Sequence, residues 1–126
     1  TDQAVVQQNI LPIIEAGQVE WVDNEWGIDD EVMLLPTPGH TPGHCSVRMR
    51  SNGQEAIITG DMMVHPVQVA EPHWSQQADS DKALAIQTRT RFVDQYCDTS
   101  TMILGTHFNT PTGVHIVSKG GNKRVS

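Results

Sequence analysis

The sequence predicts an α+β domain, built on a mostly antiparallel sheet with flanking helices. Several apolar runs have the length of β-strands, and each ends at a glycine, a proline or a turn residue. Ser51-Asn52-Gly53 is a hairpin signal between two of these runs. Residues 80–97 have the apolar spacing of a helix. With 126 residues, the chain suits a single domain over 1–126 with a core of its own.

The expected elements can be placed along the chain. Residues 2–16 form a helix that Pro12 can divide into two short turns, and Gly17 suits its end. Helix 80–97 is capped by Asp79 or Ser80, and its apolar face is expected to consist of Ala83, Ile86, Val93 and Cys97. The expected strands are 19–22, 31–36, 45–50, 55–59, 101–105 and 113–118.

Composition narrows the function classes. A net charge of −7 disfavours binding to nucleic acid. No apolar run reaches membrane-spanning length and no signal peptide is evident, so no membrane partner is expected and the cytoplasm is the default location.

Cys45 and Cys97 lie far apart in sequence, which favours two free buried thiols over a disulfide. The chain starts at Thr1 without a methionine, which favours a piece of a longer protein.

Three side chains capable of binding metal stand just beyond the ends of predicted strands: His40, Asp61 and His107. Loops at strand ends expose such groups while the sheet positions them. A carboxylate can bridge two ions and each imidazole can bind one, so this set suits a two-metal site. The residues alone leave plainer alternatives open, namely a loop histidine in solvent, a turn aspartate and a core histidine.

Three sequence motifs resemble those of the metallo-β-lactamase superfamily. They are LLPTPGHTPGH at residues 34–44, IITGD at 57–61 and ILGTHF at 103–108, in the order and at the spacing of that family. The resemblance covers nearly all of 31–118 and implies half of an αβ/βα sandwich. It also implies metal ligation by His40, Asp61 and His107, with Asp61 bridging and central to catalysis.

The same resemblance implies further roles. His44 would support the ligands without binding metal itself, and Gly39 and Gly43 would let the loop present His40. The cofactors are two divalent ions, zinc first and iron or manganese as alternatives. They would activate water to cleave an ester, lactone or phosphotriester in a small-molecule substrate.

Gly-Thr-His-Phe followed by Thr-Pro-Thr-Gly is most similar to the methyl-parathion-hydrolase and acyl-homoserine-lactonase branch. Phe108, Trp74 and His115 could then line the substrate pocket, against the plainer roles of core or loop aromatics and a strand histidine. His65 and His73 follow Asp61 and are expected in solvent. Glyoxalase II-like thioesterases and persulfide dioxygenases share the same motifs.

The family's His-x-His-x-Asp-His motif, which belongs to the N-terminal half, is absent from these residues. Each ion would keep two protein ligands, where zinc sites normally have three or four. A lone half would also expose an apolar sheet face, which favours a missing N-terminal half or self-association. The alternative from another class is a non-catalytic half-domain that acts as a binding or assembly module.

Overall fold

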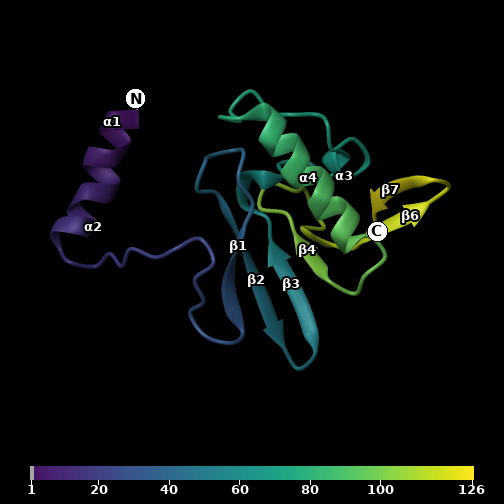
Figure 1. Cartoon of the computed structure of the whole chain (residues 1–126), viewed down its shortest axis with the longest axis horizontal. Coiled ribbons are helices and arrows are strands. Elements are labelled where there is room, and N and C mark those ends of the chain that lie inside the picture. Colours follow the sequence, from purple (N-terminus) through teal and green to yellow (C-terminus); the bar gives the residue numbers. More distant parts are fainter. Residues whose placement is uncertain (1) are drawn as a thin grey trace.

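The fold is described by a computed structural model, which covers residues 2–126. Its centre is a five-stranded sheet in the order β1-β2-β3-β4-β5, beside a two-stranded β6-β7 hairpin (Figure 1). The strands are β1 (Val32–Pro36), β2 (Cys45–Ser51), β3 (Gln54–Ile58), β4 (Met102–Leu104), β5 (Gly113–Val114), β6 (Ile116–Lys119) and β7 (Asn122–Val125). The predicted α+β class is therefore confirmed.

Strand directions in the sheet are set by one hairpin and one parallel crossover. β1 pairs antiparallel with β2, and β2 pairs antiparallel with β3 through the predicted turn. In that turn Asn52 and Gly53 both have positive φ, at 51° and 76°. β3 then pairs parallel with β4, and Ile58 stands opposite Leu104. Consequently β1, β3 and β4 all run in the same direction.

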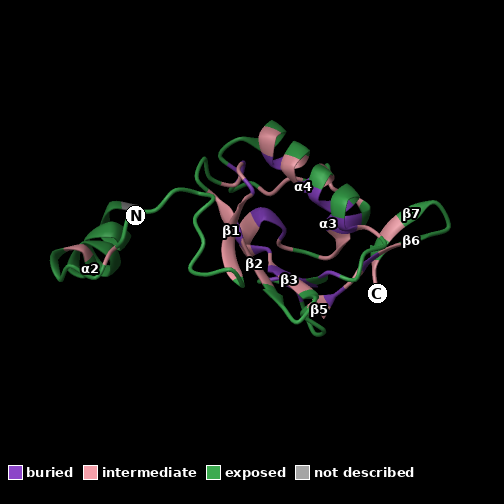
Figure 2. Cartoon of the chain, turned by 60° about the horizontal axis from the view of Figure 1, so that its bottom comes forward, coloured by how far each residue is buried: buried purple, intermediate pink, exposed green. Residues whose placement is uncertain are grey.

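Helix α4 covers one face of the sheet (Figure 2). Ile57 of β3 and Ile103 of β4 are fully buried there, in one cluster with Phe92 and Val93 of α4. The helical elements are α1 (Asp2–Val5), a π-helical turn η1 (Val6–Ile10), α2 (Leu11–Glu15), a 3₁₀ turn η2 (Gly60–Met62), α3 (Val67–Ala70) and α4 (Lys82–Tyr96).

The buried face of α4 differs from the expected one. It consists of Ala85, Arg89, Phe92, Val93 and Tyr96. The apolar pattern pointed elsewhere because a fully buried arginine occupies the centre of this face. The helix cap is also different, since the Asp81 carboxylate accepts from the Leu84 N–H at 3.0 Å.

Two more expectations are corrected. Residues 19–22 form no strand, although VEWV alternates like one, because no neighbouring strand pairs with them. The expected strand 113–118 is split into β5 and β6, and β6 turns back into β7, which the sequence did not reveal. Cys45 and Cys97 are free thiols as predicted, but half-buried. No helix within residues 2–126 has the length and apolarity needed to span a bilayer.

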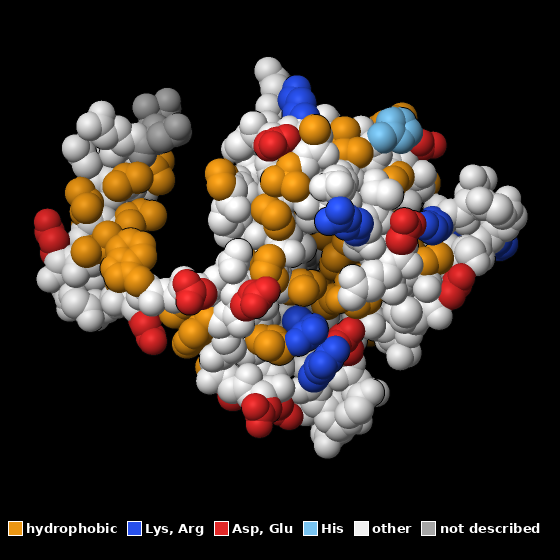
Figure 3. All heavy atoms as spheres, in the orientation of Figure 1, with side chains coloured by type: hydrophobic (Ala, Val, Ile, Leu, Met, Phe, Trp, Pro, Cys, Tyr) orange, Lys and Arg blue, Asp and Glu red, His pale blue; other side chains and the backbone are white. Residues whose placement is uncertain are grey.

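Within the part of the chain that the structure describes, no layer covers the second face of the sheet. Strand alternation puts Val47, Ile58 and Leu104 on it, and each is only half-buried, while Met102 is 41% exposed. The N-terminal arm, residues 3–22, extends away from the sheet, and apolar side chains line one side of it (Figure 3). This is the exposed apolar surface that the sequence predicts for an isolated half.

We expect the 126-residue chain by itself to self-associate through the uncovered face. Met102→Glu should weaken that association at least about tenfold, because a carboxylate would have to be buried in an apolar contact. Sedimentation velocity over a concentration series measures the effect. Gln87→Glu, which adds the same charge to the exposed side of α4, should leave association unchanged. Equal association of the two variants would exclude this face as the contact.

Candidate metal centre

The three predicted ligands meet at one edge of the sheet. Because β1, β3 and β4 run the same way, the loops that follow them leave the sheet at the same edge. His40 lies in the loop after β1, Asp61 in η2 directly after β3, and His107 three residues beyond β4. The structure therefore brings together side chains that are 21 and 46 positions apart, by the differences 61−40 and 107−61.

Asp61 is the centre of this cluster. His107 Nε2 lies 2.6 Å from Asp61 Oδ1, and His40 Nε2 lies 3.3 Å from Asp61 Oδ2. Each carboxylate oxygen thus faces one imidazole. The side chain of His40 is 16% exposed, whereas those of Asp61 and His107 are 44% and 52% exposed. The cluster is anchored on the His40 side and open on the other.

The three side chains suit a divalent metal ion, although one pair of ligand atoms lies too close together to hold it. Two ligand atoms on one tetrahedral zinc stand about 3.4 Å apart, given bonds of about 2.1 Å. The His40–Asp61 pair already has this separation, whereas the His107–Asp61 pair is at hydrogen-bond distance. Accordingly, within residues 2–126 no three such side chains form a ready-made metal group. A movement of His107 by less than about 1 Å would open the second position.

The loop that carries His40 is held by the start of α4. The Ser80 N–H and Oγ–H both donate to the His40 carbonyl, at 3.0 and 2.7 Å. The Asp81 N–H donates to the Gly39 carbonyl at 3.0 Å. Gly39 has φ +132°, and a Cβ there would overlap the backbone of Ala85. The loop thus needs glycine at this position, as the sequence predicts.

Gly43 does not share that requirement. Its φ is not positive, and nothing lies within 4 Å of the place where its Cβ would stand. The expectation that both glycines shape the loop therefore holds for Gly39 alone.

His44 links the His40 loop to Asp61. Its Nε2 accepts from the Asp61 backbone N–H at 3.0 Å, so its proton resides on Nδ1, which contacts the Thr37 carbonyl at 3.1 Å. Burial lowers the pKa of His44, and the hydrogen bond to Thr37 opposes this shift. Gly60 lets the imidazole approach, since a Cβ there would be 2.8 Å from His44 Nε2. His44 therefore fixes the backbone that presents Asp61.

The sequence did not point to Asp79 as part of the site. Its carboxylate is fully buried, with Oδ1 3.2 Å from His40 Nδ1 and Oδ2 3.5 Å from Arg89 Nη2. Burial lowers the pKa of Arg89, while the charge of Asp79 and its hydrogen bond to Arg89 raise it. No local pattern connects positions 40, 79 and 89, so only an unexplained polar residue in the apolar face of α4 could have indicated the network.

The three predicted substrate-pocket residues lie in different surroundings. Phe108 is in the hydrophobic core, packed against Gly105, because its ring fills space that a Cβ at 105 would take. His115 lies at the opposite end of the sheet, where its Nδ1 contacts the Thr101 carbonyl at 3.1 Å. The side chain of Trp74 is exposed in the loop after Asp61. Phe108 is thus a core residue and His115 lies between β5 and β6, and a substrate role for either stays a prediction.

His65 and His73 are both exposed, as expected. His73 pairs with Glu71 at 3.5 Å, and His65 Nδ1 accepts from the Val67 N–H at 3.1 Å. Among the described residues, neither forms a hydrogen bond or ion pair with Asp61. The loop after Asp61 supplies another residue, since Gln76 Nε2 donates to the Asp61 carbonyl at 2.7 Å.

No family model and no curated protein matches the sequence. Solved structures do match its fold. The hydrolase AbOPH, described as in the beta lactamase superfamily, has a TM-score of 0.85 at 24% identity, over 95% of this chain and 42% of that chain. The lactonase AidC, described as dizinc and quorum-quenching, has a TM-score of 0.80 at 22% identity, over 94% and 40%.

A probable metal-dependent hydrolase from Staphylococcus aureus has a TM-score of 0.72 at 17% identity, over 79% of this chain and 36% of that chain. The chain has part of a metallo-β-lactamase fold. It spans less than half the length of each of these three proteins, which is consistent with the predicted C-terminal half.

We predict that the two glycines of the metallo-β-lactamase-like loop respond differently to the same change. Gly39→Ala should destabilise the chain by about 1–3 kcal/mol, because it combines positive φ with overlap against Ala85. Gly43→Ala should change stability by less than about 0.5 kcal/mol. Urea unfolding monitored by circular dichroism gives both values, and equal losses would contradict the loop geometry.

A pH effect follows from His44. Its pKa in the folded chain lies below the ordinary 6.5, so in the interval between them the unfolded chain binds more protons. The free energy of unfolding should therefore fall as pH drops below about 6.5. In His44→Gln this part of the pH dependence should disappear, whereas His73→Gln, at an exposed site, should retain it. Parallel pH profiles for both variants would rule out His44 as the source.

Proposed function

We propose that this chain is the C-terminal half of a metal-dependent hydrolase. One observation carries the proposal: the two oxygens of Asp61 each face a different imidazole, at the edge of the sheet where the loops after three strands emerge. A carboxylate flanked by two imidazoles in this way is suited to bridging two ions, each with one terminal histidine. Similarity to hydrolases of the same fold supports the same reading.

In the proposed site, His40 and His107 would each hold one divalent ion and Asp61 would hold both. Zinc is the first candidate and iron or manganese are alternatives, because imidazole and carboxylate serve all three. When bound, the ions would activate water and offset the negative charge that develops on the attacked ester, lactone or phosphotriester.

The remaining residues of the chain would maintain this arrangement. His44 and Gln76 hold the backbone of Asp61, one at the N–H and the other at the carbonyl. Burial of His40 limits its rotation, whereas the exposed His107 can move to admit an ion. The open side of the cluster, next to Asp61 and His107, is where we place the small-molecule substrate.

The chain supplies only part of the ligand set, so a partner is proposed as well. Each ion would have two protein ligands here, where zinc normally takes three or four. The uncovered sheet face lies beside the cluster, because Ile58 and Leu104 end the two strands that lead to Asp61 and His107. A first half carrying His-x-His-x-Asp-His would cover this face and complete the site, with self-association as the alternative.

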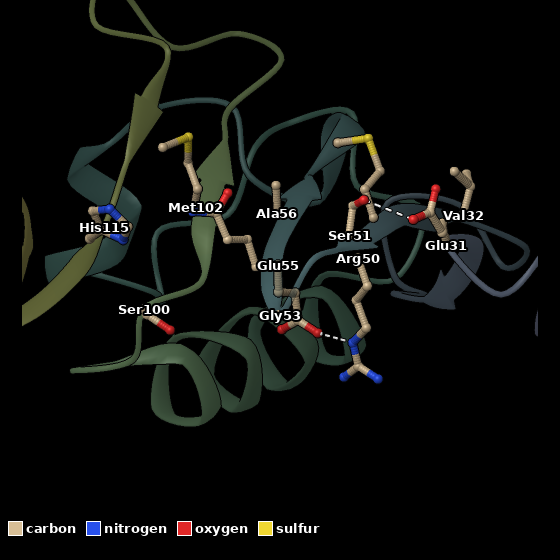
Figure 4. A pocket seen from close by; sticks show the side chains of 12 residues that line it. Glu31, Val32, Arg50, Ser51, Gly53, Glu55, Ala56, Ser100, Met102 and His115 are labelled. Atoms are coloured by element: carbon tan, nitrogen blue, oxygen red, sulfur yellow. Dashed lines mark hydrogen bonds and ion pairs between the residues drawn. The ribbon is translucent and has the colours of Figure 1, made fainter.

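A hollow of about 750 Å³ marks the far end of the same face (Figure 4). Its floor includes Met49, Ala56 and Met102, and its rim includes the pairs Ser51–Glu31 and Arg50–Glu55. Apolar side chains of a covering layer would fit this floor. We therefore attribute the hollow to the proposed partner and not to substrate.

The neighbouring structures indicate which substrates to test first. One is described as a lactonase with a bound homoserine product, and another as the hydrolase AbOPH. For the present chain we propose only a class of substrate: small molecules with an activated carbonyl or phosphoryl centre. A non-catalytic module would bind the same N-terminal half but would hydrolyse none of these substrates.

Asp61→Asn tests the proposal in the complete protein. The substitution keeps the shape of the side chain but removes the charge, so metal content should fall from about two ions per chain to less than one. Hydrolysis of a lactone, an aryl ester and an aryl phosphotriester should fall more than about 100-fold. Atomic emission and initial rates measure the two effects. Asp94→Asn, on the exposed side of α4, is the matched control. Retained metal and turnover in Asp61→Asn would refute the proposal.

A further inference from the structure

Asp79 is a buried carboxylate with every oxygen in use. The residue lies just before α4 and its side chain has no exposed surface. Oδ1 stands 3.2 Å from His40 Nδ1. Oδ2 accepts from the Gln76 N–H at 3.1 Å and faces Arg89 Nη2 at 3.5 Å. A buried carboxylate is costly unless paired, so this placement is held by specific partners.

Arg89 lies beside the Asp79 carboxylate and holds it in place. Its side chain has no exposed surface either. Its Nε donates to the Met62 carbonyl at 3.0 Å, and Nη1 donates to the carbonyls of Pro72 and Trp74 at 2.9 and 3.1 Å. These carbonyls belong to the segment that follows Asp61. The guanidinium thus joins α4, the loop after Asp61 and the carboxylate that contacts His40.

The nitrogen of His40 that carries the proton depends on which of two carboxylates accepts its hydrogen bond. The imidazole lies between two, with Nδ1 facing Asp79 and Nε2 facing Asp61 at 3.3 Å. A neutral imidazole has one N–H, and a carboxylate can only accept it. Donation to Asp79 leaves the Nε2 lone pair directed at the Asp61 side. Donation to Asp61 would put a proton where a metal has to bind.

We infer that Asp79 is a positioning residue, which fixes His40 with its proton on Nδ1 and its Nε2 free toward Asp61, and that Arg89 holds Asp79 in place for this purpose. The inference rests on the proposed function, because it assigns the free Nε2 to metal. Such outer partners orient ligating histidines, and their loss typically weakens metal binding about 10–100-fold.

Two variants test the inference in the complete protein: Asp79→Asn, and Asp79→Asn combined with Arg89→Met. The double variant removes both buried charges together, so that no unpaired guanidinium remains. Asp81→Asn is the matched control, because asparagine keeps the backbone N–H that donates to the Gly39 carbonyl, and the Asp81 side chain accepts from Leu84 rather than contacting His40. Nitrogen-15 spectra of the metal-free protein, at a pH where imidazoles are neutral, locate the His40 proton. Competition with a chromogenic chelator gives the zinc Kd.

In the wild type and in Asp81→Asn, we expect the His40 proton on Nδ1. In the two Asp79 variants, we expect that proton to be on Nε2 or divided between the two nitrogens. The zinc Kd should rise about 10–100-fold in the Asp79 variants only. Zinc binding with unchanged Kd in the variants overturns this inference alone. A wild type that binds no zinc overturns the proposed function and the inference together. If neither Asp79 variant folds, the wild-type spectrum decides, and a His40 proton on Nε2 overturns the inference.

Discussion

The structure depends on the parallel pairing of β3 with β4. Antiparallel neighbours alone would put the ends of successive strands at opposite edges of the sheet. The crossover through α4 reverses this, so that Ile58 and Leu104 stand side by side and lead to Asp61 and His107 at one edge. The same crossover buries Ile57 and Ile103 beneath α4. Core formation and assembly of the candidate site are therefore consequences of one topological feature.

The buried polar network adds a second constraint. Arg89 and Asp79 carry opposite charges inside the core, an arrangement that apolar residues could replace without loss of stability. Its orientation gives it a purpose in the proposed site. Asp79 reaches His40 directly, while Arg89 binds carbonyls of the loop that follows Asp61. The two ligand-bearing segments are thereby tied to the same helix, which holds the His40 side of the cluster, whereas the more exposed His107 lies outside this network.

The sequence predicted the three strands that lead to the candidate ligands, and the long helix α4, because their apolar patterns are local and end at clear turn residues. It also predicted that His40, Asp61 and His107 lie close together, because each of the three motifs places its metal-binding side chain just after the end of a strand. It could not predict Asp79, whose partners are 39 positions away in one direction and 10 in the other. On α4 it predicted the burial of Val93 but not the rest of the buried face, because Arg89 is polar and stands at the centre of that face. It gave no prediction for β7, which pairs with β6.

The central claim is that Asp61 bridges two metal ions in a site that a second half completes. Anomalous diffraction at the zinc edge, from crystals of the complete protein grown with zinc, tests it most directly. We expect two anomalous peaks flanking the carboxylate, each about 2 Å from one of its oxygens, one beside His40 and the other beside His107. Peaks elsewhere, or zinc that contacts neither oxygen of Asp61, would contradict the account.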